Sequence, residues 1–286
     1  MPHRVSAGSP SMDRALQRAW RATLTVAMVA VGLVMIFPIV WSFFTAFKPN
    51  SEAASASPTL LPQTWTLENF AEIWSAIPFA QLYGNTILFA GAVMVLSLAF
   101  DTMAGYALAR FEFRGRTAAF IAIIVMLMIP YQAVIIPLYD LVHSLGLGQT
   151  MAGMIIPRTA NAFGVFFMRQ FFLALPRNLE EAARIDGASE WTIFTRVMLP
   201  LTKPALLTLG LFHFQFNWND LLWPLVMSND IAGATLPAGL ALFAGQHVVE
   251  YGLLMAGSVL ALVPLILFFL IIQRTFVAGI ATTGLK

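Results

Sequence analysis

Long apolar segments separated by shorter polar ones dominate the chain. Six of them approach or exceed the roughly 20 residues that a helix needs to cross about 30 Å of hydrocarbon. They are residues 22–47, 82–109, 117–138, 151–172, 204–227 and 251–273. This pattern predicts an all-α membrane protein with six transmembrane helices.

The first apolar segment follows three arginines, Arg14, Arg18 and Arg21, as the apolar core of a secretory signal does. The apolar run is too long for that core, and no small-residue cleavage site follows it. We therefore interpret residues 22–47 as a retained span.

Basic residues predict the orientation. All but two of the 16 Lys and Arg residues lie in segments that alternating spans would place on one side of the membrane. The exceptions are Lys48, in an outer loop, and Arg158, within a span. The positive-inside rule makes those segments cytoplasmic. We expect both termini (N-in, C-in) and residues 174–203 to lie in the cytoplasm.

The composition leaves no room for a soluble domain, with 59% hydrophobic residues and a mean hydropathy of +0.78. The chain has no cysteine, which excludes disulfides, thiolate metal sites and a cysteine nucleophile. We expect one permease domain, residues 21–274. A disordered cytoplasmic N-terminus, residues 1–20, precedes it, and a cytoplasmic tail, residues 275–286, follows it.

The polar segment between the fourth and fifth spans carries helix-capping signals. Asn178, followed three residues later by Glu181, resembles a capping box and predicts the start of a short helix. Gly187 suits the left-handed position after that helix, Ser189 can cap a second short helix, and Pro200 is expected to end it. The segment therefore predicts a helix-turn-helix, although an amphipathic loop at the lipid headgroups remains an alternative.

The residues of this segment also form a specific motif. Glu181-Ala182-Ala183, Gly187 and Leu199-Pro200, with Val197 in place of the commoner Ile, have the spacing of the EAA signature. The chain thus resembles the permease subunits of bacterial ABC importers.

Further short motifs favour the carbohydrate-uptake branch of that family, closest to the second permease of maltose-type systems. They are 107–111 with 113–115, 129–130, 136–139, 169–171, and 218–220 with 223–225. The similarity extends from about residue 28 to the C-terminus.

The resemblance implies a mechanical role, since in this family the EAA element is a coupling helix that sits in a cleft of a cytoplasmic ATPase. The residues assigned to this coupling role are Glu181, Ala182, Ala183, Arg184, Asp186, Gly187, Leu199 and Pro200. Small Ala182 and Ala183 would permit close helix approach, and Glu181 would offer a charge-assisted hydrogen bond.

The resemblance also implies the partners: a second homologous permease, two cytoplasmic ATPase subunits, an extracytoplasmic solute-binding protein and a sugar-like solute, in the bacterial cytoplasmic (inner) membrane. This chain has no phosphate-binding loop, no catalytic constellation and no metal-ligand cluster. We expect ATP and Mg²⁺ to be bound by the partner ATPase, no cofactor in this chain, and no nucleic-acid partner.

Polar side chains inside predicted spans are candidates for the substrate pathway, because burying them in lipid is costly. Arg158 and Asp220 should lie at similar depth in the outer half of the bilayer, so we expect them to pair. The residues expected to line the pathway are Asn85, Tyr131, Arg158, Asn161, Asn217, Asn219 and Asp220. A structural pair between helices without substrate contact remains an equal alternative.

Three other in-span features carry weaker predictions. Asp101 has no obvious cation in this chain, so we expect its partner on another subunit. We expect His213 to bond to a neighbouring helix rather than to face the pathway. Pro130 and Pro137 predict a break or kink in the third span.

Outside the membrane, residues 48–81 and 228–250 either lie on the headgroups or meet the solute-binding protein; both readings stay open. An ion-coupled secondary transporter is the alternative function. It would be expected to show inverted repeats or a chain of in-membrane acids, and here only Asp101 and Asp220 qualify.

Overall fold

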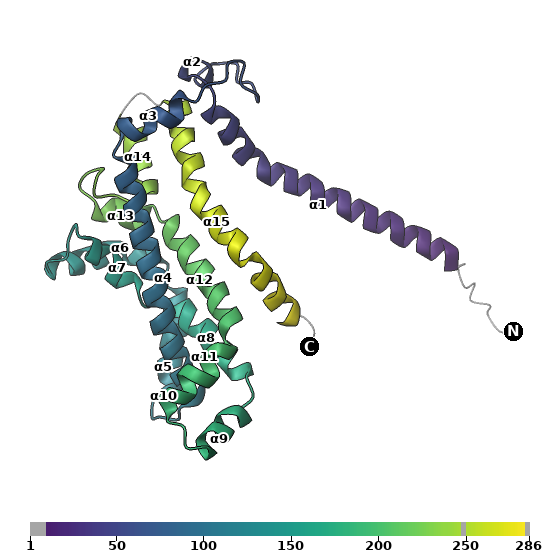
Figure 1. Ribbon diagram of the computed structural model, residues 1–286, viewed down its shortest axis with the longest axis vertical. Coiled ribbons are helices and arrows are strands. Elements are labelled where there is room, and N and C mark those ends of the chain that lie inside the picture. The colour runs from purple at the N-terminus through teal and green to yellow at the C-terminus, as the bar shows by residue number, and fades with distance from the viewer. Residues whose placement is uncertain (1–9, 247–249, 284–286) are drawn as a thin grey trace. The chain divides into compact units, whose positions relative to one another are not determined.

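The computed structural model describes residues 10–246 and 250–283, and the described residues form helices with no strand among them (Figure 1). They fall into two compact units. One holds the chain up to Phe70 together with Glu250–Val259, and the other holds Ala71–Val249 together with the chain from Leu260 onward. Helices α3 (Glu68–Ala76) and α15 (Tyr251–Thr283) contribute to both.

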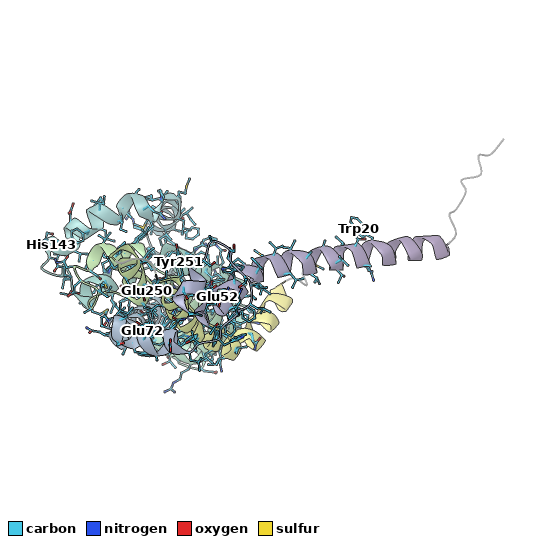
Figure 2. All side chains as sticks on the ribbon, turned by 90° about the horizontal axis from the view of Figure 1, so that it is seen from above. Trp20, Glu52, Glu72, His143, Glu250 and Tyr251 are labelled. Carbon is cyan, nitrogen blue, oxygen red and sulfur yellow. The ribbon has the colours of Figure 1, made fainter. Side chains whose placement is uncertain are left out.

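The first unit contains α1 (Pro10–Ala46) and the short α2 (Asn50–Ala53). Within the part of α1 that is long and apolar enough to span a membrane, Trp20–Ala46, the most apolar stretch has no buried residue. Trp20, labelled in Figure 2, is 65% exposed. Within the first unit, this stretch of α1 therefore contributes no buried residue to the packing.

The structure differs from the expected termini. Residues 10–20, which we expected to be disordered, form the first turns of α1. Pro10 stands at the start of the helix, where its missing N–H breaks no helical hydrogen bond. Helix α15 continues to Thr283, and the cytoplasmic location of residues 275–286 stays a prediction. Residues 1–9 and 284–286 lie outside the described residues.

The loop after α1 is closed by side-chain bonds. The Glu52 carboxylate accepts hydrogen bonds from the backbone N–H groups of Gln63 (2.9 Å) and Thr64 (3.2 Å). The Gln63 bond is the main cause that lowers the pKa of Glu52. The Asn69 side chain donates to the carbonyl oxygens of Ala46 (2.8 Å) and Lys48 (2.7 Å). These bonds fix the conformation of the loop that follows the C-terminal end of α1.

The second unit is built around one long helix. In chain order it holds α4 (Phe79–Arg110), α5 (Arg116–Met128), α6 (Tyr131–Ser144), α7 (Met151–Ile155), the 3₁₀ helix η1 (Ile156–Arg158), α8 (Ala162–Ala174), α9 (Asn178–Ile185), α10 (Glu190–Thr192), the π-helix η2 (Ile193–Met198), α11 (Leu199–Leu201), α12 (Lys203–Trp218), α13 (Leu222–Met227) and α14 (Leu236–Gln246). Helix α4 packs along both α8 and α12 (Figure 1).

Two apolar clusters surround α4. Near its C-terminal end, Tyr106 packs with Phe172 of α8, Phe194 of η2 and Leu209 of α12, all buried. Further towards its N-terminus, Phe89 packs in a second cluster that includes residues of α6, α7 and α13. Because both clusters include residues of α4, this helix is the central element of the second unit.

Residues 10–246 and 250–283 contain four helices long and apolar enough to cross a membrane, or up to six if each of two bent pairs is one span. In the first bent pair, α5 ends at Met128 and α6 begins at Tyr131 with a 105° bend, so the predicted break occurs at Pro130. Pro137 lies inside α6 without ending it. The fold class is thus a helical membrane protein with four to six candidate spans.

The fourth and fifth predicted spans are also interrupted. The fourth loses helical structure between Arg158 and Ala162. The fifth, expected at residues 204–227, is not one helix, because α12 ends at Trp218 and α13 begins at Leu222. An Asp220 oxygen accepts the Trp223 N–H (3.4 Å), as a capping carboxylate does at a helix start. Breaks of this kind leave backbone groups inside the membrane domain for polar neighbours.

The contact between α4 and α8 requires glycine at position 105. A Cβ on Gly105 would lie 2.7 Å from the Met168 Cβ and 2.9 Å from the Arg169 backbone nitrogen. We expect Gly105→Ala to push the helices apart and to destabilise the fold by about 1–3 kcal/mol, seen as a lower Tm in detergent. Gly91→Ala is the matched control, since nothing lies within 4 Å of a Cβ there. Equal Tm values for the two variants would contradict this packing.

Candidate functional site

The segment between α8 and α12 forms the expected helix-turn-helix. Helix α9 is followed by Gly187, whose φ of +81° is the left-handed conformation expected there. The Ser189 hydroxyl accepts a hydrogen bond from the Thr192 N–H at 3.3 Å and caps α10. Two of the sequence-based capping predictions are therefore confirmed.

Two other predictions for this segment are wrong. Asn178 is the first residue of α9 rather than its cap, because Arg177 is already helical and its carbonyl accepts the N–H groups of Glu180 and Glu181. Pro200 does not end the second helix. It lies at the start of α11, where no N–H is needed, and the chain turns at Thr202 with a 78° bend into α12.

The signature residues divide into an exposed and a packed set. Exposed residues are Glu181, Ala182, Arg184, Asp186, Gly187 and Pro200; Ala183 and Leu199 pack against the apolar cluster around Tyr106. Ile185 is 86% exposed and Trp191 is 65% exposed. The element therefore offers an uncovered surface with two large apolar side chains and the Glu181 carboxylate.

An ion pair fixes the two short helices to each other. Arg184 donates from Nε to one Glu190 oxygen (2.6 Å) and from Nη2 to the other (3.1 Å). This two-point contact lowers the pKa of Glu190 and raises that of Arg184. Both side chains are largely exposed, so the pair orients the helices more than it stabilises them.

A second candidate site lies where three helices are interrupted. The Arg158 Nη2 donates to an Asp220 oxygen at 2.7 Å, and its Nε donates to the Asn217 side-chain oxygen at 3.3 Å. Arg158 and Asp220 side chains are each only 9% exposed. The guanidinium lies 4.5 Å from the centre of the Tyr131 ring. The predicted pairing of Arg158 with Asp220 is confirmed, and Tyr131 and Asn217 join it.

Three other pathway candidates bond to backbone instead. The Asn161 side-chain oxygen accepts the N–H groups of Phe163 and Gly164 and caps α8. The Asn219 amide donates to the Gln215 carbonyl, and the Asn85 amide donates to the carbonyls of two residues before α14. Each of these three side chains therefore bonds to backbone groups, and none lies among the hydrogen-bond partners of Arg158.

The expectation that Asp101 has its partner on another subunit is wrong. One Asp101 oxygen lies 2.9 Å from the His213 Nε2, and the other accepts the Asn161 N–H at 3.1 Å. Gly164 makes this possible, because a Cβ there would lie 1.8 Å from the carboxylate. His213 does bond to a neighbouring helix, as expected. An acid and a histidine at similar depth on two spans were the only sequence signal for this pair.

The two buried pairs belong to one network. The Asn217 amide donates to the His213 carbonyl at 2.7 Å while its oxygen accepts from Arg158. The Ser97 hydroxyl of α4 donates to the Arg158 carbonyl at 3.1 Å. Helices α4, α8 and α12 are thereby joined by polar bonds at the level where η1 and α12 end.

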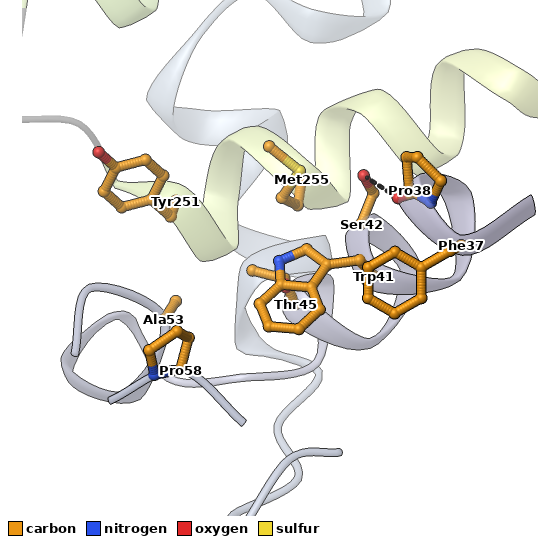
Figure 3. Close-up of a pocket in the computed structure, with 9 residues that line it drawn as sticks. All are labelled: Phe37, Pro38, Trp41, Ser42, Thr45, Ala53, Pro58, Tyr251 and Met255. Carbon is orange, nitrogen blue, oxygen red and sulfur yellow. Dashed lines mark hydrogen bonds between the residues drawn. The ribbon is translucent and has the colours of Figure 1, made fainter. Parts of the chain in front are cut away.

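The first unit contains an open pocket of about 580 Å³ (Figure 3). It is lined mainly by apolar residues of α1 and the start of α15, including Phe37, Trp41 and Met255. No Asp, Glu, Lys, Arg or His lines it. The cavity has few groups that could recognise a polar solute. No group of three or more His, Asp or Glu residues in the described part of the chain could hold a metal ion.

Comparisons with known proteins agree with these features. The model of the family described as "Binding-protein-dependent transport system inner membrane component" matches residues 101–282. The chain is 38% identical over 268 residues to the arabinooligosaccharides transport system permease protein AraQ of Halalkalibacterium halodurans, covering 92% of this chain and 95% of that protein. It is 32% identical over 271 residues to the diacetylchitobiose uptake system permease protein NgcG of Streptomyces coelicolor, covering 93% and 89%.

The fold is shared with a solved transporter. A chain in the crystal structure of a bacterial ABC transporter that imports the acidic polysaccharide alginate superposes with a TM-score of 0.80 at 24% identity, covering 96% of this chain and 100% of that chain.

The helical membrane domain, taken together with the family match, identifies a multi-pass transport permease. The chain belongs to the family of binding-protein-dependent transport system inner membrane components. This confirms the resemblance to permease subunits of carbohydrate-uptake ABC importers that the EAA signature indicated.

The Arg158–Asp220 pair yields a prediction on stability. Asp220→Asn leaves a buried guanidinium without its counter-charge, which we expect to cost about 3–5 kcal/mol. The double variant Arg158→Gln with Asp220→Asn should be more stable than Asp220→Asn, because no buried charge remains unpaired. Thermal unfolding in detergent measures both, with Asp140→Asn on the exposed face of α6 as the control. If the double variant lost as much stability as Arg158→Gln and Asp220→Asn lose together, the two side chains would not interact and the pair would be contradicted.

Proposed function

We propose that this chain carries a sugar or sugar-like solute inward across the bacterial cytoplasmic membrane, driven by ATP that a separate ATPase subunit hydrolyses. The observation that carries this is the exposed face of α9 and α10, which presents Glu181, Ile185 and Trp191 on a capped and ion-paired scaffold. Such a face fits a helix that inserts into a cleft of another protein.

A sugar-like solute is supported by the relatives. Their names give arabinooligosaccharides and diacetylchitobiose as the solutes of their systems. Both are short saccharides rich in hydroxyl groups. We assign the same chemical class to this importer, and leave the individual sugar to the cognate solute-binding protein.

The partners follow from the same proposal. Two ATPase subunits, which bind ATP and Mg²⁺, would hold α9 on the cytoplasmic side, and a solute-binding protein would dock on the outer face. A second homologous permease would complete the pathway.

Within the membrane, we assign the substrate pathway to the surroundings of Arg158. The aromatic rings of Tyr131 and Phe216 lie 4.5 and 5.4 Å from its guanidinium, and Asn217 and Asp220 complete the group. Aromatic faces and fixed polar groups are the combination that binds sugars. The cavity next to α1 lacks charged groups and has no part in this assignment.

Substitutions on the exposed face of α9 test the proposed contact with the ATPase. Ile185→Asp should weaken ATPase binding at least tenfold, because burying an Ile contributes about 1.5–3 kcal/mol. Glu181→Ala should reduce the solute transported per ATP hydrolysed. Both side chains are exposed, so membrane insertion should be unchanged. Co-purification of the ATPase and transport in proteoliposomes measure these effects.

Glu72→Ala, an exposed glutamate on α3, is the matched control for both variants. Wild-type ATPase binding by Ile185→Asp, together with wild-type coupling by Glu181→Ala, would refute the proposed coupling face.

A further inference from the structure

Two neighbouring glutamates on α9 have opposite surroundings. Glu181 is exposed, whereas Glu180 is 3% exposed. Successive residues of a helix point about 100° apart, so one carboxylate faces outward while the other faces the rest of the chain. The EAA signature accounts for the first of these and does not include the second.

Glu180 meets the last residue of α4. Its Oε1 lies 3.0 Å from the Arg110 Nε, and the two side chains are 4% and 2% exposed. These two atoms are not aligned for a hydrogen bond. The contact is therefore a close, buried pair of opposite charges.

The other cation near Glu180 is a weaker partner. Arg184 lies 4.0 Å from Glu180, is 42% exposed and is bonded at both ends of its guanidinium to Glu190. Burial raises the pKa of Glu180 above its ordinary value, and Arg110, followed by Arg184, opposes this rise. Arg110 is thus the main group that favours the charged carboxylate.

Arg110 joins three helices at one point. Its Nη2 donates to the Leu175 carbonyl at 2.8 Å, directly after α8 ends, while its Nε faces Glu180 on α9. A few residues earlier, Gly105 brings α4 into direct contact with Met168 of α8. The C-terminal ends of α4 and α8 and the buried face of α9 are therefore held together.

Helix α4 connects this point to the buried polar network. It runs without interruption from Phe79 to Arg110 and carries Asp101, which bonds to His213 of α12 and to the backbone at the start of α8. By contrast, helical structure is lost near Arg158 and after Trp218. A displacement applied to the end of α4 therefore reaches the network along one continuous helix.

We propose that Arg110 and Glu180 are positioning residues for energy coupling, which hold α9 on the ends of α4 and α8 so that force applied to the exposed face of α9 moves those helices. This inference rests on the proposed function, in which an ATPase acts on α9. Without the pair, α9 would turn on its loops and the force would be lost.

The test measures whether α9 and α4 move together. The chain contains no cysteine, so spin labels at Met103→Cys on α4 and Arg177→Cys before α9 report one distance in the full complex with its ATPase. In the otherwise unchanged chain we expect the same distance with and without ATP. In Glu180→Gln, ATP should produce a second, shifted population. The charge swap, Arg110→Glu with Glu180→Arg, should restore the single distance.

The control is Glu112→Gln, which removes an exposed carboxylate two residues from Arg110 and should leave the distance unchanged. An unshifted distance in Glu180→Gln with ATP would overturn the inference, as would a swap no better than Arg110→Glu alone. If a single variant fails to insert into the membrane, the charge-swap variant decides. A swap variant that inserts and shows one distance between the labels supports the pair, whereas one that inserts and shows two distances refutes it.

ATPase co-purification in the same preparations separates the two hypotheses. If the ATPase does not bind the otherwise unchanged chain, the proposed function fails. If it binds and Glu180→Gln behaves like the parent chain, only the role of the ion pair fails.

Discussion

The membrane domain depends on the carboxylate of Asp101, because this one side chain bonds to two other helices away from water. A buried carboxylate is costly unless its oxygens find donors. Here one oxygen meets His213 and the other meets a backbone N–H at the start of α8. Gly164 supplies the space. The bonds make the angle between α4, α8 and α12 specific, where apolar packing alone would tolerate sliding.

Several predictions made from the sequence were correct because they depend on a few neighbouring residues only. Gly187, Ser189 and Pro130 were placed correctly, because a left-handed turn, a helix cap and a missing N–H each depend on a few neighbouring residues. The Arg158–Asp220 pair was found because two charges at equal depth in lipid have few other partners. The depth of a residue in the membrane can be predicted from its position within an apolar segment of the sequence.

Other features depend on which face of a helix is covered. The partner of Asp101 lies 112 positions away and is a histidine, which a search for cations passes over. The burial of Glu180 beside the exposed Glu181 follows from how α9 lies on α4, and no spacing shows this. Asn85, Asn161 and Asn219 are polar residues in or near spans, yet helix breaks and loops provide backbone partners for them.

Helix α1 has a consequence for the life of the protein in the cell. Its most apolar stretch has no buried residue within the first unit. An apolar surface of this length is stable only in lipid or against other apolar helices. Outside a membrane, this helix would expose its apolar side chains to water, and a large exposed apolar surface promotes aggregation.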